Sequence, residues 1–193
     1  VWRVFSERQV DWLMLEVALL SIPFAPAGVR PGLGAASPPS PLTLFMMRWL
    51  LVRVMLGPGL AKFLSGDPRW RDFSALSHLY ETAPSPTVLA YLDHHLPAAW
   101  HIFEWALTFA AEIGAPLLAI LGGSRCRWVA LGLWCALQMG IQLTCNFGWL
   151  NTASIGLGFL LLDDRMLAAA RDKLGWRGTA RWFVVPLGTA PIR

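Results

Sequence analysis

The sequence of 193 residues has the length of about one domain. Its residues are 55% hydrophobic and only 15% charged, whereas soluble domains average about 45–50% and 25%, so a disordered chain, a collagen-like fibre and an ordinary soluble enzyme are excluded and a membrane protein is predicted. The net charge of +4 comes from dispersed basic residues rather than a basic stripe, so we expect membrane lipid and not nucleic acid as a partner.

Apolar stretches bounded by polar or proline-rich breaks predict five membrane spans, at residues 12–25, 44–64, 100–121, 128–145 and 149–162. The first and the last are shorter than the ~20 residues that a spanning helix needs, so we expect them to be tilted or half-buried. The expected fold is an all-α, polytopic transmembrane helical bundle whose core covers residues 1–164. Because the sequence opens at Val1 without an initiator methionine, we also expect a fragment or an atypical start.

Two segments between the predicted spans differ in character. Residues 27–41 are rich in Pro, Gly and Ser and predict a connector. Residues 65–98 form the longest polar stretch and carry aromatics, prolines and histidines, which predicts a structured loop. Lys and Arg are concentrated in residues 165–193, so the positive-inside rule predicts a cytoplasmic C-terminal segment and, by alternation, an extracytoplasmic 65–98 loop.

Five charged residues interrupt the predicted spans: Glu16, Arg53, Lys62, Glu104 and Glu112. A charge near the bilayer centre costs at least ~2.5–3.5 kcal/mol, so each should face the protein interior and have a partner. Counting a rise of about 1.5 Å per residue from the span ends puts Arg53 level with Glu112, and we predict that they pair. The sequence leaves two interpretations of this buried polar seam open, namely ion pairs that fix helix register or a cavity that handles protons or substrate.

Two further features lie within the spans. The tripeptide Gly57-Pro58-Gly59 predicts a kink or an unwound turn in the second span, although close helix packing is an alternative explanation of its small residues. Gln138 and Gln142, one turn apart in the fourth span, predict hydrogen bonds between helices.

No familiar catalytic or metal-binding signature occurs in the sequence. The three cysteines, Cys126, Cys135 and Cys145, show no CxxC spacing, so neither a disulfide framework nor a zinc site is expected. His94 and His95 are adjacent and lack acidic neighbours at ligand spacing, so we predict no metal and no cofactor. Nucleophile-elbow, zinc-protease, phosphate-loop and dinucleotide motifs are all missing from the sequence.

An ordered series of motifs runs through the second predicted span and the loop. Its members are Arg48-Trp49-Leu50-Leu51, Met55-Leu56-Gly57, Gly59-Leu60-x-Lys62, Gly66-Asp67-Pro68-x-Trp70-Arg71-Asp72, Tyr80-Glu81-Thr82-x-Pro84-x-Pro86 and Tyr91-Leu92-x-His94-His95-x-Pro97. Further along the chain, Glu112 is followed by Pro116, and Asn146, Asn151 and Asp163-Asp164 complete the series. The series resembles the lipase maturation factor family, over residues 44–164.

The resemblance implies an integral membrane maturation factor, or chaperone, that assists the folding or assembly of secreted lipase-like client proteins without a cofactor. Such a protein would lie in the endoplasmic reticulum membrane of a eukaryote or the plasma membrane of a bacterium. On this interpretation the loop faces the client, and the expected contact or positioning residues are Trp70, Arg71, Asp72, Tyr80, Glu81, Tyr91, His94 and His95.

The sequence also allows an alternative function. The lipase maturation factor family is distantly similar to the vitamin K-dependent carboxylase-like membrane proteins, which implies a membrane-embedded enzyme acting on a lipid or quinone-like substrate. Lys62, His101 and Glu104 would then be the acid–base groups, because all three fall near the outer membrane face.

Overall fold

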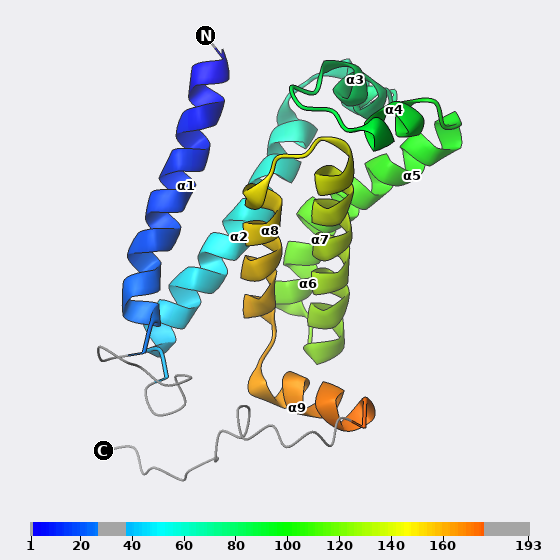
Figure 1. Ribbon diagram of the computed structural model, residues 1–193. Helices are drawn as coiled ribbons and strands as arrows, with labels where there is room; N and C mark the ends of the chain where they lie inside the picture. Colours follow the sequence, from blue (N-terminus) through cyan, green and yellow to red (C-terminus); the bar gives the residue numbers. More distant parts are fainter. Residues whose placement is uncertain (1, 27–37, 176–193) are drawn as a thin grey trace, which may run out of the picture. The chain divides into compact units, whose positions relative to one another are not determined.

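The computed structural model describes residues 2–26 and 38–175, and within those ranges it is all-α, without strands (Figure 1). The elements are α1 (Trp2–Phe24), α2 (Pro41–Leu64), η1 (Pro68–Trp70), α3 (Ala75–Thr82), α4 (Val88–His94), α5 (Ala98–Phe109), η2 (Ala110–Gly114), α6 (Ala115–Leu121), α7 (Ser124–Thr144), α8 (Trp149–Gly158), η3 (Phe159–Leu161) and α9 (Asp164–Lys173). Two compact units divide the chain: residues 51–163 form one, and residues 1–50 with 164–193 form the other. Most of the predicted connector 27–41 and the C-terminal segment after residue 175 lie outside the described residues.

Each of the five predicted spans coincides with a helix, which confirms the expected all-α membrane fold. Two helical rods, Pro41–Leu64 and Ala98–Leu121, each have 24 residues and are long and apolar enough to cross a bilayer. Only 33% and 28% of their apolar windows are buried inside the protein, so most of this apolar surface is free to face lipid. The fourth predicted span, α7, falls short of this standard, because polar glutamines interrupt its apolar run.

The residues of helix α2 explain where it begins and how it packs. The backbone N–H of Thr43 donates to Ser40 Oγ at 3.1 Å, so Ser40 caps the helix. Pro41 occupies the first helical position, where its missing N–H costs nothing. The helix then runs unbroken through Pro58, so the predicted unwinding at Gly57-Pro58-Gly59 is wrong. Close packing explains Gly59, because a Cβ there would lie 2.8 Å from the Cβ of Glu112, whereas a Cβ on Gly57 would meet nothing within 4 Å.

The third predicted span contains a feature that we did not predict, a π-helical turn at Ala110–Gly114 between α5 and α6. Here the N–H of Ala115 donates to the carbonyl of Ala110, five residues back. The proline at position 116 explains the turn, because a proline ring clashes with the carbonyl four residues earlier, in this case that of Glu112. Glu112 therefore sits in the widened turn, where it is buried.

The core of the 51–163 unit is organised around α7, which packs against α6 and α8. The indole N–H of Trp134 donates to the carbonyl of Ser154 at 2.9 Å and so ties α7 to α8. Asn151 on α8 donates to the side-chain oxygen of Gln142 at 3.2 Å, which confirms an interhelical hydrogen bond for that glutamine. At the first turn of α7, Arg127 pairs with Asp163 at 3.2 Å.

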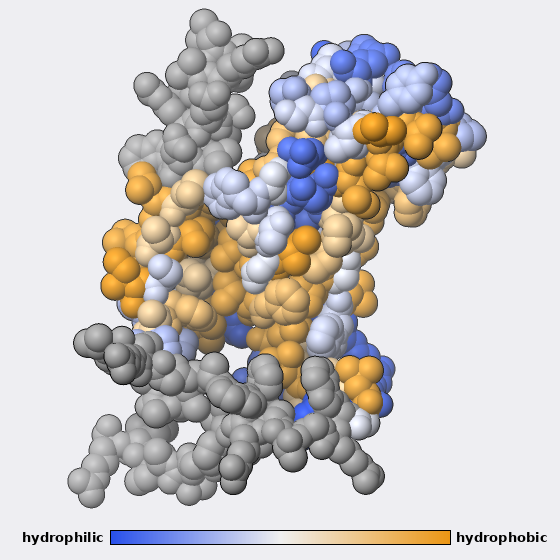
Figure 2. Space-filling view, in the orientation of Figure 1, coloured by the Kyte–Doolittle hydropathy of each residue, from blue (hydrophilic) through white to orange (hydrophobic). Residues whose placement is uncertain are grey.

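The 65–98 segment is structured, as predicted, and lies at the opposite end of α7 from Arg127. Helices α3 and α4 pack against each other, and α4 also packs against α7. Hydrophilic side chains gather at the end of the 51–163 unit that carries α3 and α4, while the middle of its helices is hydrophobic (Figure 2). This distribution fits a loop that lies outside the bilayer.

Candidate functional site

Lys62 and Glu112 form an ion pair between α2 and the π-helical turn. The ammonium also lies 5.5 Å from the centroid of the Trp70 ring, within range of a cation–π contact. Glu112 is almost fully buried, with 6% of its side chain exposed, and its Oε2 has no hydrogen-bond partner among the residues that the structure describes. The predicted pairing of Arg53 with Glu112 is therefore wrong.

The reason for this error is the close contact at Gly59. Gly59 and Lys62 are three residues apart and share one face of α2. Because Gly59 packs directly against Glu112, the same face brings Lys62 to the carboxylate. Arg53 would lie level with Glu112 only if both helices started level at the membrane surface, whereas this contact sets the actual register. Glu16 lies in the other unit, so its place in the seam stays a prediction.

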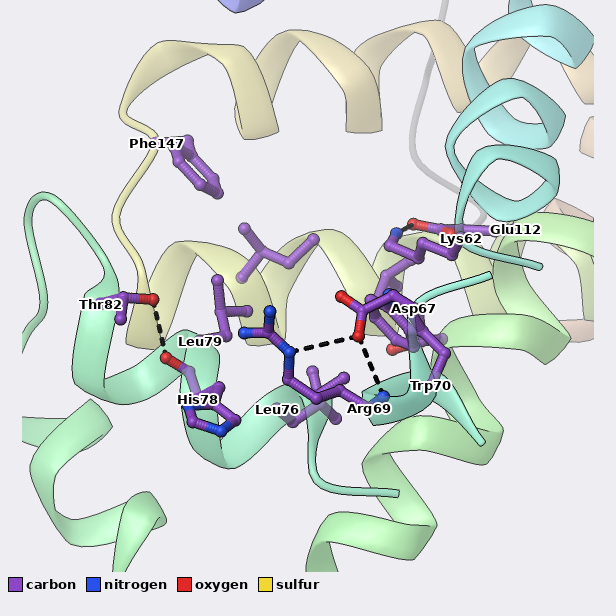
Figure 3. Close-up of a pocket in the computed structure, with 14 residues that line it drawn as sticks. Lys62, Asp67, Arg69, Trp70, Leu76, His78, Leu79, Thr82, Glu112 and Phe147 are labelled. Carbon is purple, nitrogen blue, oxygen red and sulfur yellow. Dashed lines mark hydrogen bonds and ion pairs between the residues drawn. The ribbon is translucent and has the colours of Figure 1, made fainter. Parts of the chain in front are cut away.

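A pocket of about 370 Å³ opens beside this ion pair (Figure 3). Lys62 and Glu112 lie together on one side of it, and Phe147 lies on the other (Figure 3). Arg69, held by Asp67 at 3.2 Å, projects between them. Charged side chains of both signs therefore line the pocket in pairs, and the remaining wall is largely apolar.

A second polar cluster joins the loop to α5. The Tyr80 hydroxyl donates to Glu104 Oε1 at 2.6 Å, and His101 Nδ1 lies 3.2 Å from Glu104 Oε2. Burial and, after it, the hydrogen bond to Glu104 raise the pKa of Tyr80 far above its ordinary value, so the phenol keeps its proton. Asp93 lies beside Glu104 and accepts a hydrogen bond from the Trp100 indole at 2.5 Å.

Trp70 connects the start of the loop to α5. Its carbonyl accepts a hydrogen bond from the Trp105 indole at 2.9 Å, and its ring packs edge-on against Phe109 at 5.7 Å between centroids. Phe73, whose φ of 66° is unusual for a residue other than glycine, packs edge-on against Trp105 at 4.9 Å. These aromatic contacts fix the η1 turn against the side of α5.

Thr87 fastens the other end of the loop to α7. Its hydroxyl donates to the carbonyl of Leu143 at 2.5 Å and accepts from the backbone N–H of Leu89 and Ala90, which caps α4. Its own N–H donates to the carbonyl of Thr144 at 2.9 Å. One residue thus starts α4 and holds it at the end of α7.

The change Thr87→Ala is expected to loosen α4 from α7, because it removes the helix cap and one link to the end of α7. The expected loss is about 1–2 kcal/mol in the local opening free energy. Hydrogen exchange measured by mass spectrometry should show faster exchange at the amides of Leu89 and Ala90. Thr87→Ser, which keeps the hydroxyl, is the control and should exchange at the original rate. Equal rates for all three proteins would contradict the proposed anchoring role.

The residues that we expected to face a client differ in how exposed they are. Arg71, Asp72, Glu81, Tyr91 and His95 are exposed, and Trp70 and His94 are half-buried. Tyr80 is buried against Ala90 and Cys145, so the prediction that it contacts a client is wrong. The residues next to Tyr80 in the sequence do not indicate that it is buried. Its burial depends on α3, which directs the hydroxyl toward Glu104 on α5.

Two carboxylates on the exposed part of the loop, Glu81 and Asp72, interact with residues close to them in the loop. Glu81 lies between two imidazoles, 3.5 Å from His78 and 3.6 Å from His94. The side chain and the backbone N–H of Ser74 donate hydrogen bonds to Asp72, and they hold the pKa of that carboxyl below its ordinary value. Asp72 therefore stays ionised under mildly acidic conditions.

The three residues of the enzyme alternative do not form one site. His101 and Glu104 are in contact with each other, whereas Lys62 pairs with Glu112. In the described part of the chain no group of three His, Cys, Asp or Glu residues is arranged to hold a metal ion.

Three residues of this region were missed by sequence reasoning. Thr87 follows a Pro-Ser-Pro break and precedes an apolar run, which is the signature of a helix cap and could have identified it. The indole N–H of Trp105 donates to the carbonyl of Trp70. The sequence could have suggested such a bond, because the indole N–H of a tryptophan inside a protein usually has a hydrogen-bond partner. Asp93 gave no comparable signal.

The helices and the loop define an all-α membrane protein whose loop is fixed to α5 and to the end of α7. The family model of the lipase maturation factor transmembrane domain matches residues 1–169. The chain therefore belongs to the lipase maturation factor family.

Named relatives support this assignment. The chain is 37% identical to lipase maturation factor 2 of Rattus norvegicus over 177 residues, which is 88% of this chain and 25% of the relative. It is 36% identical to lipase maturation factor 2 of Homo sapiens over 177 residues, with the same coverage. It is 33% identical to lipase maturation factor 1 of Homo sapiens over 199 residues, or 94% of this chain and 34% of the relative.

The chain thus spans about a quarter to a third of the length of these relatives. No solved structure matches it.

Proposed function

We propose that this protein is an integral membrane maturation factor that assists the folding or assembly of secreted lipase-like proteins. The observation that carries the proposal is the match of residues 1–169 to the transmembrane domain of lipase maturation factors. The names of the relatives supply the client class. We place the protein in the endoplasmic reticulum membrane of a eukaryote or the plasma membrane of a bacterium, with the 65–98 loop on the extracytoplasmic side.

The loop has the properties that a client-binding platform needs. Its 70–87 part is fixed at both ends, by the aromatic contacts of Trp70 and by the hydrogen bonds of Thr87. Side chains of both charges are exposed between these anchors, including Arg71, Asp72 and Glu81. A rigid scaffold that presents exposed groups binds with a smaller loss of conformational entropy than a flexible one. We propose that this part of the loop contacts the client and that Trp70 positions it.

The proposal can be tested by expressing the full chain in cells that lack their own lipase maturation activity. We expect the activity per mass of a co-expressed secreted lipase to rise, while secretion of an unrelated secreted protein stays constant. Equal lipase activity per mass with and without the chain would contradict the proposed maturation function.

Trp70→Ala is expected to abolish client maturation while membrane insertion stays intact. The change removes the ring that packs against Phe109 and contacts Lys62, so the η1 turn loses its fixed position. Insertion is measured by carbonate extraction and maturation by lipase activity per mass. Trp128→Ala is the control, because Trp128 is an exposed tryptophan at the opposite end of α7. Equal loss of maturation in both variants would contradict a specific role of Trp70.

A further inference from the structure

Helix α4 carries an exposed apolar stripe. Val88, Tyr91 and Leu92 are 79%, 66% and 56% exposed, and their spacing of three and four residues places them on one face of the helix. Ala90, on another face, is buried. The polar side chains of α4 are engaged elsewhere, since Asp93 binds Trp100 and His94 lies beside Glu81. The stripe itself contains no charged residue.

The last turn of α4 is linked to the spanning helix α5. The Trp100 indole donates to Asp93, which links the end of α4 to the first turn of α5. The Trp100 ring then packs against Phe103 at 5.4 Å, and both rings are exposed. A tryptophan whose N–H is bonded to a polar group while its ring faces apolar surroundings is typical of the membrane–water interface. We therefore expect the spanning rod Ala98–Leu121 to leave the bilayer at the level of Trp100.

Helix α4 is held at that same level. Thr87 attaches its first turn to the last carbonyls of α7, and Asp93 attaches its last turn to the start of α5. Both attachments are to helix ends on the side of the 51–163 unit that carries α3 and α4 (Figure 1). The depth of α4 is thus set by the helices of the membrane core.

From these contacts we propose that α4 is an interfacial membrane helix, with Val88, Tyr91 and Leu92 inserted into the lipid surface. The occupant of the stripe is the bilayer, because Asp93 links α4 to the start of a spanning rod whose apolar surface is mostly not buried inside the protein. An amphipathic helix at this depth buries its apolar face at the boundary between headgroups and acyl chains. This assigns Tyr91 to lipid, in place of the client contact expected from the sequence.

Hydroxyl-radical footprinting tests the proposal on the unmodified protein. The full chain is purified without client and reconstituted in phosphatidylcholine nanodiscs, and oxidation of Tyr91 is compared with oxidation of His78, each relative to the free amino acid. His78 is a suitable reference because half of its side chain is exposed on α3. We expect Tyr91 to be protected several-fold more than His78, despite its larger exposed fraction. Equal or weaker protection of Tyr91 would overturn the proposal and would leave the stripe free for a client.

Spin labels give an independent readout. In a background with the three native cysteines replaced by alanine, Val88→Cys is compared with Arg71→Cys, both exposed positions of the same loop. We expect the ratio of collisions with oxygen to collisions with a water-soluble nickel chelate to be several-fold higher at position 88. Similar ratios at the two positions would overturn the interfacial placement. Neither measurement involves a client, so both outcomes are separate from the test of the maturation function.

Discussion

Replacing Lys62 with methionine is expected to destabilise the protein by about 3 kcal/mol. The change leaves Glu112 buried without the ammonium that neutralises it, and removing one member of a buried ion pair costs ~3–5 kcal/mol. We expect the lower part of that range because 26% of the Lys62 side chain is exposed. Thermal or denaturant-induced unfolding in detergent micelles measures the effect.

Two further variants make this expectation specific. The double change Lys62→Met with Glu112→Leu should recover much of the lost stability, because no unpaired charge remains in the apolar interior. Arg69→Met removes the exposed pair with Asp67 and should cost less than ~1 kcal/mol. A double variant no more stable than the single one would contradict the pairing. If the double variant also matures a lipase client normally, a catalytic role for Lys62 is excluded.

Gly59→Ala is expected to destabilise the protein by about 2 kcal/mol, the middle of the range for overpacked cores. The added Cβ would lie 2.8 Å from both Glu112 Cβ and Ile113 Cγ1 and 3.3 Å from the backbone carbon of Glu112. Backbone cannot rotate away as a flexible side chain can, so α2 must move away from the π-helical turn. Such a shift also weakens the contact between Lys62 and Glu112.

The matched control is Gly57→Ala, two residues earlier in the same helix. A Cβ on Gly57 meets nothing within 4 Å, so the change should be neutral or should stabilise α2 by about 0.5–1 kcal/mol through helix propensity. Unfolding of both variants in the same detergent provides the comparison. If both glycines behave alike, the close approach at Gly59 does not govern helix packing.

The helices and their membrane character followed from the sequence alone, for a local reason. Long apolar runs need lipid or a protein interior, and a chain that is 55% hydrophobic has too little polar surface to cover them in water. Proline and serine at the start of α2 define its beginning within a few residues. The motif series from Arg48 to Pro97 likewise identified the family, since an ordered set of short motifs depends only on the order of residues in the chain.

Contacts between helices were decided only by the tertiary structure. Arg53 and Lys62 are both basic residues of α2, and the choice between them as partner of Glu112 depends on where α2 crosses the π-helical turn. Tyr80 and Tyr91 are both loop tyrosines, yet one hydroxyl reaches Glu104 and the other side chain stays exposed. Sequence spacing specifies which residues share a face of one helix. It does not specify the rotation and crossing point of a second helix, because those depend on close contacts between residues far apart in the chain.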